Sequence, residues 1–97
     1  MKRVLIFEKD GLEVIMEVNP VEIDGICNLN AKIMLRKNGL YKEFGLENFM
    51  FDVLPMISDK KLFLFNNGLT LTEDDLLNIQ VMSIGMNLFQ YALTLSK

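Results

Sequence analysis

The sequence predicts one α+β domain over residues 1–97, in which an antiparallel sheet of about five to six strands carries a short helix and a longer C-terminal helix on one face. Three observations predict this fold class. Apolar residues alternate with a period of two in the first half of the chain. Asp-Gly and Asn-Gly pairs separate these runs, and after Gly45 the apolar spacing becomes helical.

The runs RVLIFEK and LEVIMEV flank Asp10-Gly11 and predict the first hairpin. A two-residue turn would place Glu8 opposite Glu13, where like charges repel. We therefore expect a three-residue loop that puts Lys9 opposite Glu13. This register also gathers five apolar residues on one face: Val4, Ile6, Val14, Met16 and Val18.

The segment NPVEIDG, residues 19–25, is expected to be a loop because it opens with Asn-Pro and closes with Asp-Gly. The run CNLNAKIML then alternates and predicts a half-buried strand. Its buried face is expected to hold Cys27, Leu29, Ala31, Ile33 and Leu35. Asn38-Gly39 marks a second hairpin turn, which leads into the strand LYKEF.

The spacing of apolar residues over 46–54 predicts a short helix, which Pro55 is expected to end. The residues on its apolar face are Leu46, Phe49, Met50, Val53 and Leu54. The run KLFLF at 61–65 predicts a further strand, and Asn67-Gly68 predicts a turn into the short strand LTL.

The C-terminal segment predicts a helix over 73–95. Thr72 is a suitable N-cap, and Asp75 stands three residues later, where a capping box has its acid. Polar residues recur at steps of three and four and form one narrow stripe: Gln80, Ser83, Asn87, Gln90 and Thr94. Gly85 costs this helix about 1 kcal/mol relative to alanine, so two helices that meet near Gly85 are the main alternative.

Residues 76–95 contain no charge and are numerous enough to cross a bilayer. The polar stripe and the absence of basic flanking residues argue against a crossing, so we expect no membrane partner. The helix is expected to lie on the sheet, to pair with a second copy, or both. The expected interface residues are Leu77, Val81, Met82, Ile84, Met86, Leu88, Phe89, Tyr91 and Leu95.

Composition argues against most catalytic and binding chemistry. The chain has no histidine, a net charge of −3 and a sequence pI of about 4.8, which disfavours metal binding, general-base catalysis and nucleic acid. Cys27 has no histidine to activate it, and the acids at 73–75 are expected to serve as helix caps. We expect no enzymatic activity, no cofactor, no metal and no nucleic-acid partner.

A chain that is 51% hydrophobic yet only 97 residues long is expected to keep apolar surface for a partner. We therefore expect a small non-enzymatic protein-binding module, such as an inhibitor, an immunity-type protein or an adaptor, that forms a homodimer through its C-terminal helix. The start MKRVLIFEKD has too short an apolar run for a signal peptide, which predicts a cytoplasmic protein. A structural component of a larger assembly, such as a virion or secretion machine, and a small enzyme or ligand sensor are the alternatives.

Overall fold

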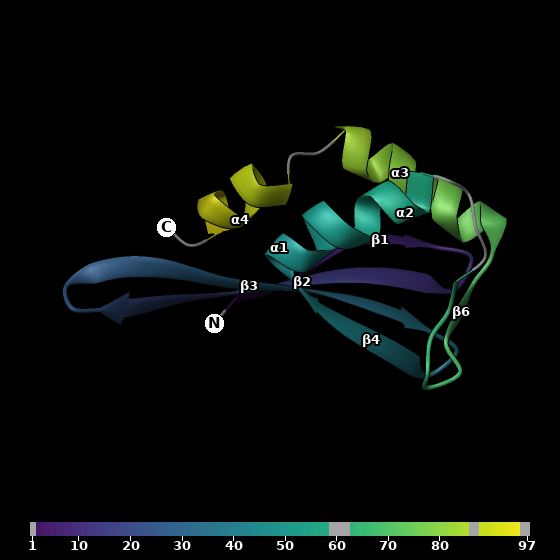
Figure 1. Ribbon diagram of the computed structural model, residues 1–97, viewed down its shortest axis with the longest axis horizontal. Coiled ribbons are helices and arrows are strands. Elements are labelled where there is room, and N and C mark those ends of the chain that lie inside the picture. The colour runs from purple at the N-terminus through teal and green to yellow at the C-terminus, as the bar shows by residue number, and fades with distance from the viewer. Residues whose placement is uncertain (1, 59–62, 86–87, 96–97) are drawn as a thin grey trace.

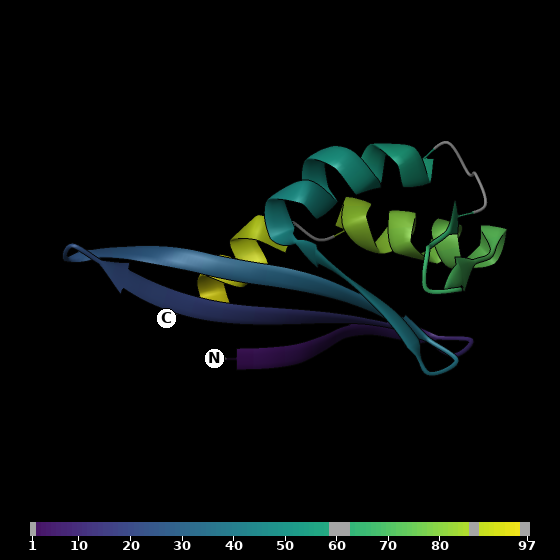
Figure 2. The ribbon, with the colours of Figure 1, turned by 60° about the horizontal axis from the view of Figure 1, so that its bottom comes forward.

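A four-stranded antiparallel sheet carries a layer of helices on one face (Figures 1 and 2). The computed structural model describes residues 2–58, 63–85 and 88–95, without the side chains of 27–29, 56, 58, 82–85, 89 and 95. The strands lie in the sheet in their order along the chain: β1 (Lys2–Lys9), β2 (Leu12–Ile23), β3 (Ile26–Lys37) and β4 (Leu40–Gly45). The predicted α+β fold class is confirmed.

Two-residue turns join these four strands. Their first residues are Asp10, Asp24 and Asn38, with φ between 53° and 54°, and a glycine with φ between 78° and 83° follows each. A type I′ turn requires positive φ at both central residues, which Asp-Gly and Asn-Gly pairs adopt readily. The hairpins predicted at 10–11 and 38–39 are confirmed.

The predicted register of the first hairpin is wrong. Lys9 pairs with Leu12 and Glu8 pairs with Glu13, so the turn has two residues and not three. The carboxylate of Glu13 also meets the guanidinium of Arg36 on β3, with 2.8 Å between Nη2 and Oε2. This ion pair offsets the repulsion between the two glutamates, and it depends on a third strand that the hairpin sequence does not contain.

An irregularity of the β-bulge type in β1 interrupts the alternation of its side chains. The register shifts between Leu5 and Phe7, so that Val4 pairs with Met16 while Phe7 pairs with Val14. All five residues predicted for the apolar face belong to the core or pack against it: Val4, Ile6, Val14, Met16 and Val18.

The loop predicted for residues 19–25 is also wrong, because β2 continues through Pro20 to Ile23. Pro20 pairs with Leu29 of β3, whereas the pairing with β1 ends at Val18. Among the described strands, β2 therefore has a neighbour on one side only at Pro20. A proline is tolerated in such an edge position because its missing N–H can face solvent.

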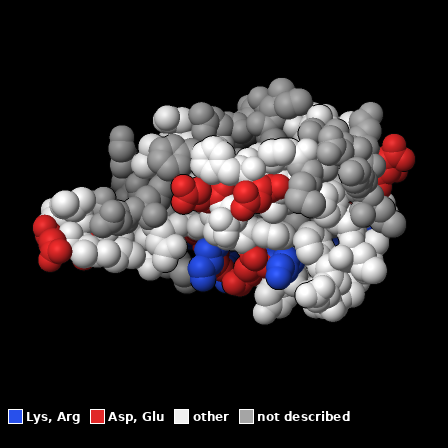
Figure 3. Space-filling model, in the orientation of Figure 1, with Lys and Arg blue, Asp and Glu red and all other residues white. Residues whose placement is uncertain are grey.

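The continuation of β2 and the start of β3 form a two-stranded projection, residues 19–30, which we call the arm. Neither β1 nor β4 pairs with these residues, and the arm extends from the body of the molecule in Figure 1. It contributes to a longest dimension of 44 Å, against 26 and 21 Å in the other directions. The arm holds two acids, Glu22 and Asp24, and no basic residue, and acidic side chains mark its free end in Figure 3.

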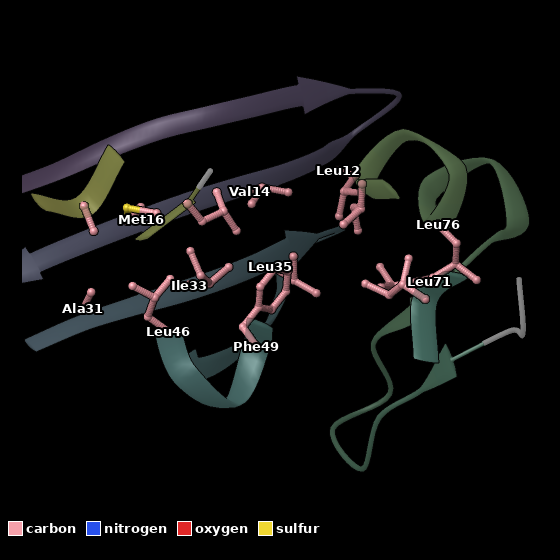
Figure 4. Packing of buried hydrophobic residues seen from close by; sticks show 14 of the residues in the cluster. Leu12, Val14, Met16, Ala31, Ile33, Leu35, Leu46, Phe49, Leu71 and Leu76 are labelled. Carbon is pink, nitrogen blue, oxygen red and sulfur yellow. The ribbon is translucent and has the colours of Figure 1, made fainter. Parts of the chain in front are cut away.

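The core lies between the sheet and the helices (Figure 4). From the predicted face of β3, Ala31 is 8% exposed and Ile33 and Leu35 are fully buried, which confirms that assignment for these residues. The side chains of Cys27 and Leu29 lie outside the described residues, so their predicted burial stays a prediction.

The first helical segment runs past the proline that was expected to end it. It consists of α1 (Leu46–Asn48), a π-helical turn η1 (Phe49–Val53) and α2 (Leu54–Ser58), which contains Pro55. The N–H of Leu54 donates to the carbonyl of Phe49, an i to i+5 bond that widens the helix directly before the proline. A proline in a regular helix lacks one bond and clashes with the carbonyl of the preceding turn, and a wider turn gives the proline ring more room.

The last two strands do not join the main sheet, so the expected single sheet of five to six strands is wrong. β5 (Phe63–Leu64) and β6 (Thr70–Leu71) form a separate two-stranded sheet around Gly68, whose φ is 88°. The side-chain amide of Asn67 donates to the backbone carbonyl of Tyr41 on β4. A side chain therefore uses a carbonyl of β4 that a further strand would need.

The described residues of the C-terminal segment form two helices, α3 (Glu73–Gly85) and α4 (Leu88–Leu95), in place of the one helix expected over 73–95. α3 ends at Gly85, which has the weakest helix propensity in this segment. α4 inclines toward the sheet (Figure 2) and contacts β2 and β3, where Leu88 and Ala92 are buried. Burial of this second apolar surface against the sheet favours the different direction that α4 takes in Figure 2 over one straight helix.

Candidate interaction surface

The start of α3 is held by the predicted capping box. The N–H of Thr72 donates to Oδ2 of Asp75 over 2.9 Å, and the N–H of Asp75 donates to Oγ1 of Thr72 over 3.3 Å. Two backbone donors at the open end of the helix are thereby satisfied. The prediction that Thr72 caps the helix is confirmed.

Replacement of Thr72 by alanine is expected to lower the free energy of unfolding by about 1 kcal/mol, because one capping hydrogen bond is lost. Urea denaturation followed by circular dichroism measures this change. Thr70→Ala is a matched control, since the Thr70 hydroxyl bonds only the nearby carbonyl of Gly68, at 3.4 Å. Equal effects of the two substitutions would contradict the capping role.

Asp75 also fixes α3 to the sheet. Its Oδ2 lies 2.6 Å from Nζ of Lys37, the last residue of β3, and the two side chains are only 3% and 15% exposed. Burial alone would raise the pKa of Asp75, but hydrogen bonds from Lys37 and Thr72 and the lysine charge lower it below its usual range. No local pattern in the sequence indicates this pair, because the two residues are 38 positions apart.

The Lys37–Asp75 pair orients α3, with one side toward the core and the other toward solvent. Leu76 and Ile79 are fully buried. Leu77 and Val81, one turn apart, are 45% and 62% exposed. We call Leu77 and Val81 the α3 apolar face, and both were expected at an interface.

The other expected interface residues fall into two groups. Leu88 is 2% exposed and lies in the core of its own chain, and Tyr91 is half-buried against that core. The remaining positions lie outside the described side chains: Met82, Ile84, Met86, Phe89 and Leu95. Leu88 therefore contributes to the contact between α4 and the sheet and is not available to a partner.

The expected polar stripe is divided between the two helices. Gln80 is half-buried on α3, whereas Gln90 and Thr94 are exposed on α4. The Thr94 hydroxyl donates to the carbonyl of Gln90 over 3.0 Å, and this hydrogen bond lies within α4 itself. Ser83 and Asn87 lie outside the described side chains.

The face of the sheet away from the helices offers a less apolar surface. It carries the apolar residues Leu5 and Ile15, which pair with each other, and Ile15 is only 7% exposed. Ion pairs flank them on both sides, namely Arg3 with Glu17 and Arg36 with Glu13. These charges and their hydration make the face a weaker candidate for apolar docking than α3.

Within residues 2–58, 63–85 and 88–95, no three His, Cys, Asp or Glu side chains gather as a metal site would require. No described helix is both long enough and apolar enough to span a membrane. No protein-family model matches the chain, and no curated protein or solved structure is significantly similar to it.

Proposed function

We propose that this protein is a small non-enzymatic protein-binding module of the cytoplasm whose binding surface includes the α3 apolar face. The observation that carries the proposal is the exposure of Leu77 and Val81 on a helix that the Lys37–Asp75 pair and the core hold in place. Burial of each such side chain by a partner is worth about 1.5–3 kcal/mol when complete. A held helix loses little further freedom on binding, which favours affinity.

The chemistry around this face suggests the kind of partner. Glu73 and Asp74 are exposed at the first turn of α3, and α3 has no basic residue. The surface is therefore apolar with an acidic rim. It suits a partner helix or groove that is apolar at its centre and basic at its border. An inhibitor, an immunity-type protein and an adaptor each use a surface of this kind, and a second copy of the chain is the other occupant that we propose for it.

The double substitution Leu77→Glu with Val81→Glu tests the proposal. Both side chains are exposed, so the variant is expected to fold with a nearly unchanged denaturation midpoint while its affinity for a partner falls at least tenfold. The partner is identified by cross-linking in the native cell, purified, and titrated by calorimetry. The same titration with Leu64→Glu is the control, because Leu64 is 73% exposed and lies on β5, outside α3. Unchanged affinity of the double variant would refute the proposed surface.

A structural component of a larger assembly is the second candidate, and the arm favours it. A projecting two-stranded arm whose edges pair with no other described strand is a means of joining subunits through backbone hydrogen bonds. Light scattering after gel filtration at several concentrations distinguishes the candidates. A mass that grows without limit as concentration rises would favour the assembly, and a fixed small mass would favour the binding module.

A further inference from the structure

The two edges of the arm differ in their chemistry. The edge formed by β2 contains Pro20, which lacks an N–H, and Glu22, which carries a charge. Proline and charge are the usual means by which proteins keep an exposed strand edge from pairing. The β2 edge is therefore protected against the addition of a strand.

The edge formed by β3 has no such protection. β4 pairs with β3 only from Lys32 to Lys37, and no described strand pairs with residues 27–30 on that side. These four residues, Cys-Asn-Leu-Asn, contain no proline and no charge. The pairing with β2 already holds the backbone of these residues in an extended conformation. We call residues 27–30 the open edge.

We propose that the open edge binds the same edge of a second copy of this chain, as an antiparallel strand pair about a two-fold axis at Asn28. This inference rests on the proposed function as a protein-binding module. It places the second copy on the arm, and the α3 apolar face then remains for a foreign partner. The open edge is self-complementary, since an antiparallel pair uses the same donors and acceptors from both strands.

Charge supports this arrangement and this register. With Asn28 on the axis, Ile26 at the start of β3 lies opposite Asn30 of the other copy, so the turn that holds Asp24 comes close to the segment that holds Lys32 of the other copy. Both charged residues are exposed at those positions. The acidic end of each arm (Figure 3) thereby comes close to a lysine. The turn of each arm reaches only as far as the end of β4 in the other copy, where the pairing of β4 with β3 begins. The arrangement continues the sheet from one copy into the other without displacing β4.

A single cysteine placed on the axis tests the proposal. In the Cys27→Ser background, Asn28→Cys would stand opposite its own copy, with Cβ atoms about 4.5–5.5 Å apart. This approaches the spacing of about 3.5–4.5 Å that a disulfide needs. Asn30→Cys in the same background is the matched control, since its copy would lie about four residues along the strand, or about 13 Å away.

We expect light scattering to give the mass of two chains for the unmodified protein. Under mild oxidation, the Asn28→Cys variant is expected to form a covalent dimer at least tenfold faster than the Asn30→Cys variant. Equal rates, or a monomer at every concentration, would overturn the inference. A dimer that Leu77→Glu with Val81→Glu dissociates would place the second copy on α3, so the arm assignment would fail while the protein-binding proposal stood. If the chain proved monomeric while a foreign partner still bound α3, the arm assignment would likewise fail and the protein-binding proposal would stand.

Discussion

Replacement of Asp75 by asparagine is expected to lower the free energy of unfolding by about 3 kcal/mol, because it leaves the ammonium of Lys37 unpaired in a site where it is 15% exposed. Asparagine keeps an oxygen that can accept from the N–H of Thr72, so the loss comes mainly from the ion pair. Urea denaturation at neutral pH measures the change.

The double substitution Lys37→Met with Asp75→Asn is the control. It removes the unpaired charge, and a methionine fills part of the volume of the lysine stem. The double variant is therefore expected to be more stable than Asp75→Asn alone. If the double variant were the less stable of the two, an uncompensated lysine charge would not be the cause of the loss.

The same pair makes stability depend on pH in a defined direction. Because the pKa of Asp75 is lower in the folded chain than in the unfolded chain, its contribution is fully present above the unfolded value of about 3.9. The contribution is lost as the pH falls through the folded pKa. The difference in stability between the unmodified protein and Asp75→Asn should thus be constant above about pH 5 and shrink in more acidic solution. A difference that grew on acidification would contradict the lowered pKa.

Replacement of Phe49 by alanine is expected to cost about 3–5 kcal/mol, the range for removal of a buried aromatic ring. Phe49 is fully buried in η1, and its ring centroid lies 5.9 Å from that of Phe44 on β4. The substitution leaves a cavity where the helical segment packs on the sheet. Chemical denaturation measures the loss, and the cooperativity of the transition shows whether the helix still packs on the sheet.

Phe51→Ala is the matched control, because Phe51 lies two residues further in the same helical turn and is 69% exposed. Its removal is expected to change the free energy of unfolding by no more than about 0.5 kcal/mol. Comparable losses for the two phenylalanines would mean that the segment is oriented differently from the structure described above.

The sequence predicted the features that depend on residues close together in the chain. Asp10-Gly11 and Asn38-Gly39 adopt positive φ for local steric reasons, so the turns were foreseeable. The same holds for the reciprocal bonds of Thr72 and Asp75, which lie three residues apart. Alternation also predicted the burial of Ile33 and Leu35, since a strand with one covered face requires it.

Both prolines were misjudged because their effect depends on what surrounds them. Pro20 continues a strand, since β1 no longer pairs with β2 at that point. Pro55 continues a helical segment, since a π-helical turn precedes it. In each case the local rule describes the cost of the proline correctly, and the neighbouring structure lowers that cost.

For the candidate surface, the sequence determined that the C-terminal segment is helical and largely apolar, and that Leu77 and Val81 belong to it. Only the tertiary structure decided which of its residues face outward. The contact between Lys37 and Asp75 orients α3, and the contact of α4 with β2 and β3 buries Leu88. Which edge of the arm stays open was decided in the same way, because β4 ends its pairing at Lys32. Such contacts join residues far apart in the chain, and local propensities and periodicities carry no information about which of these pairings the folded chain makes.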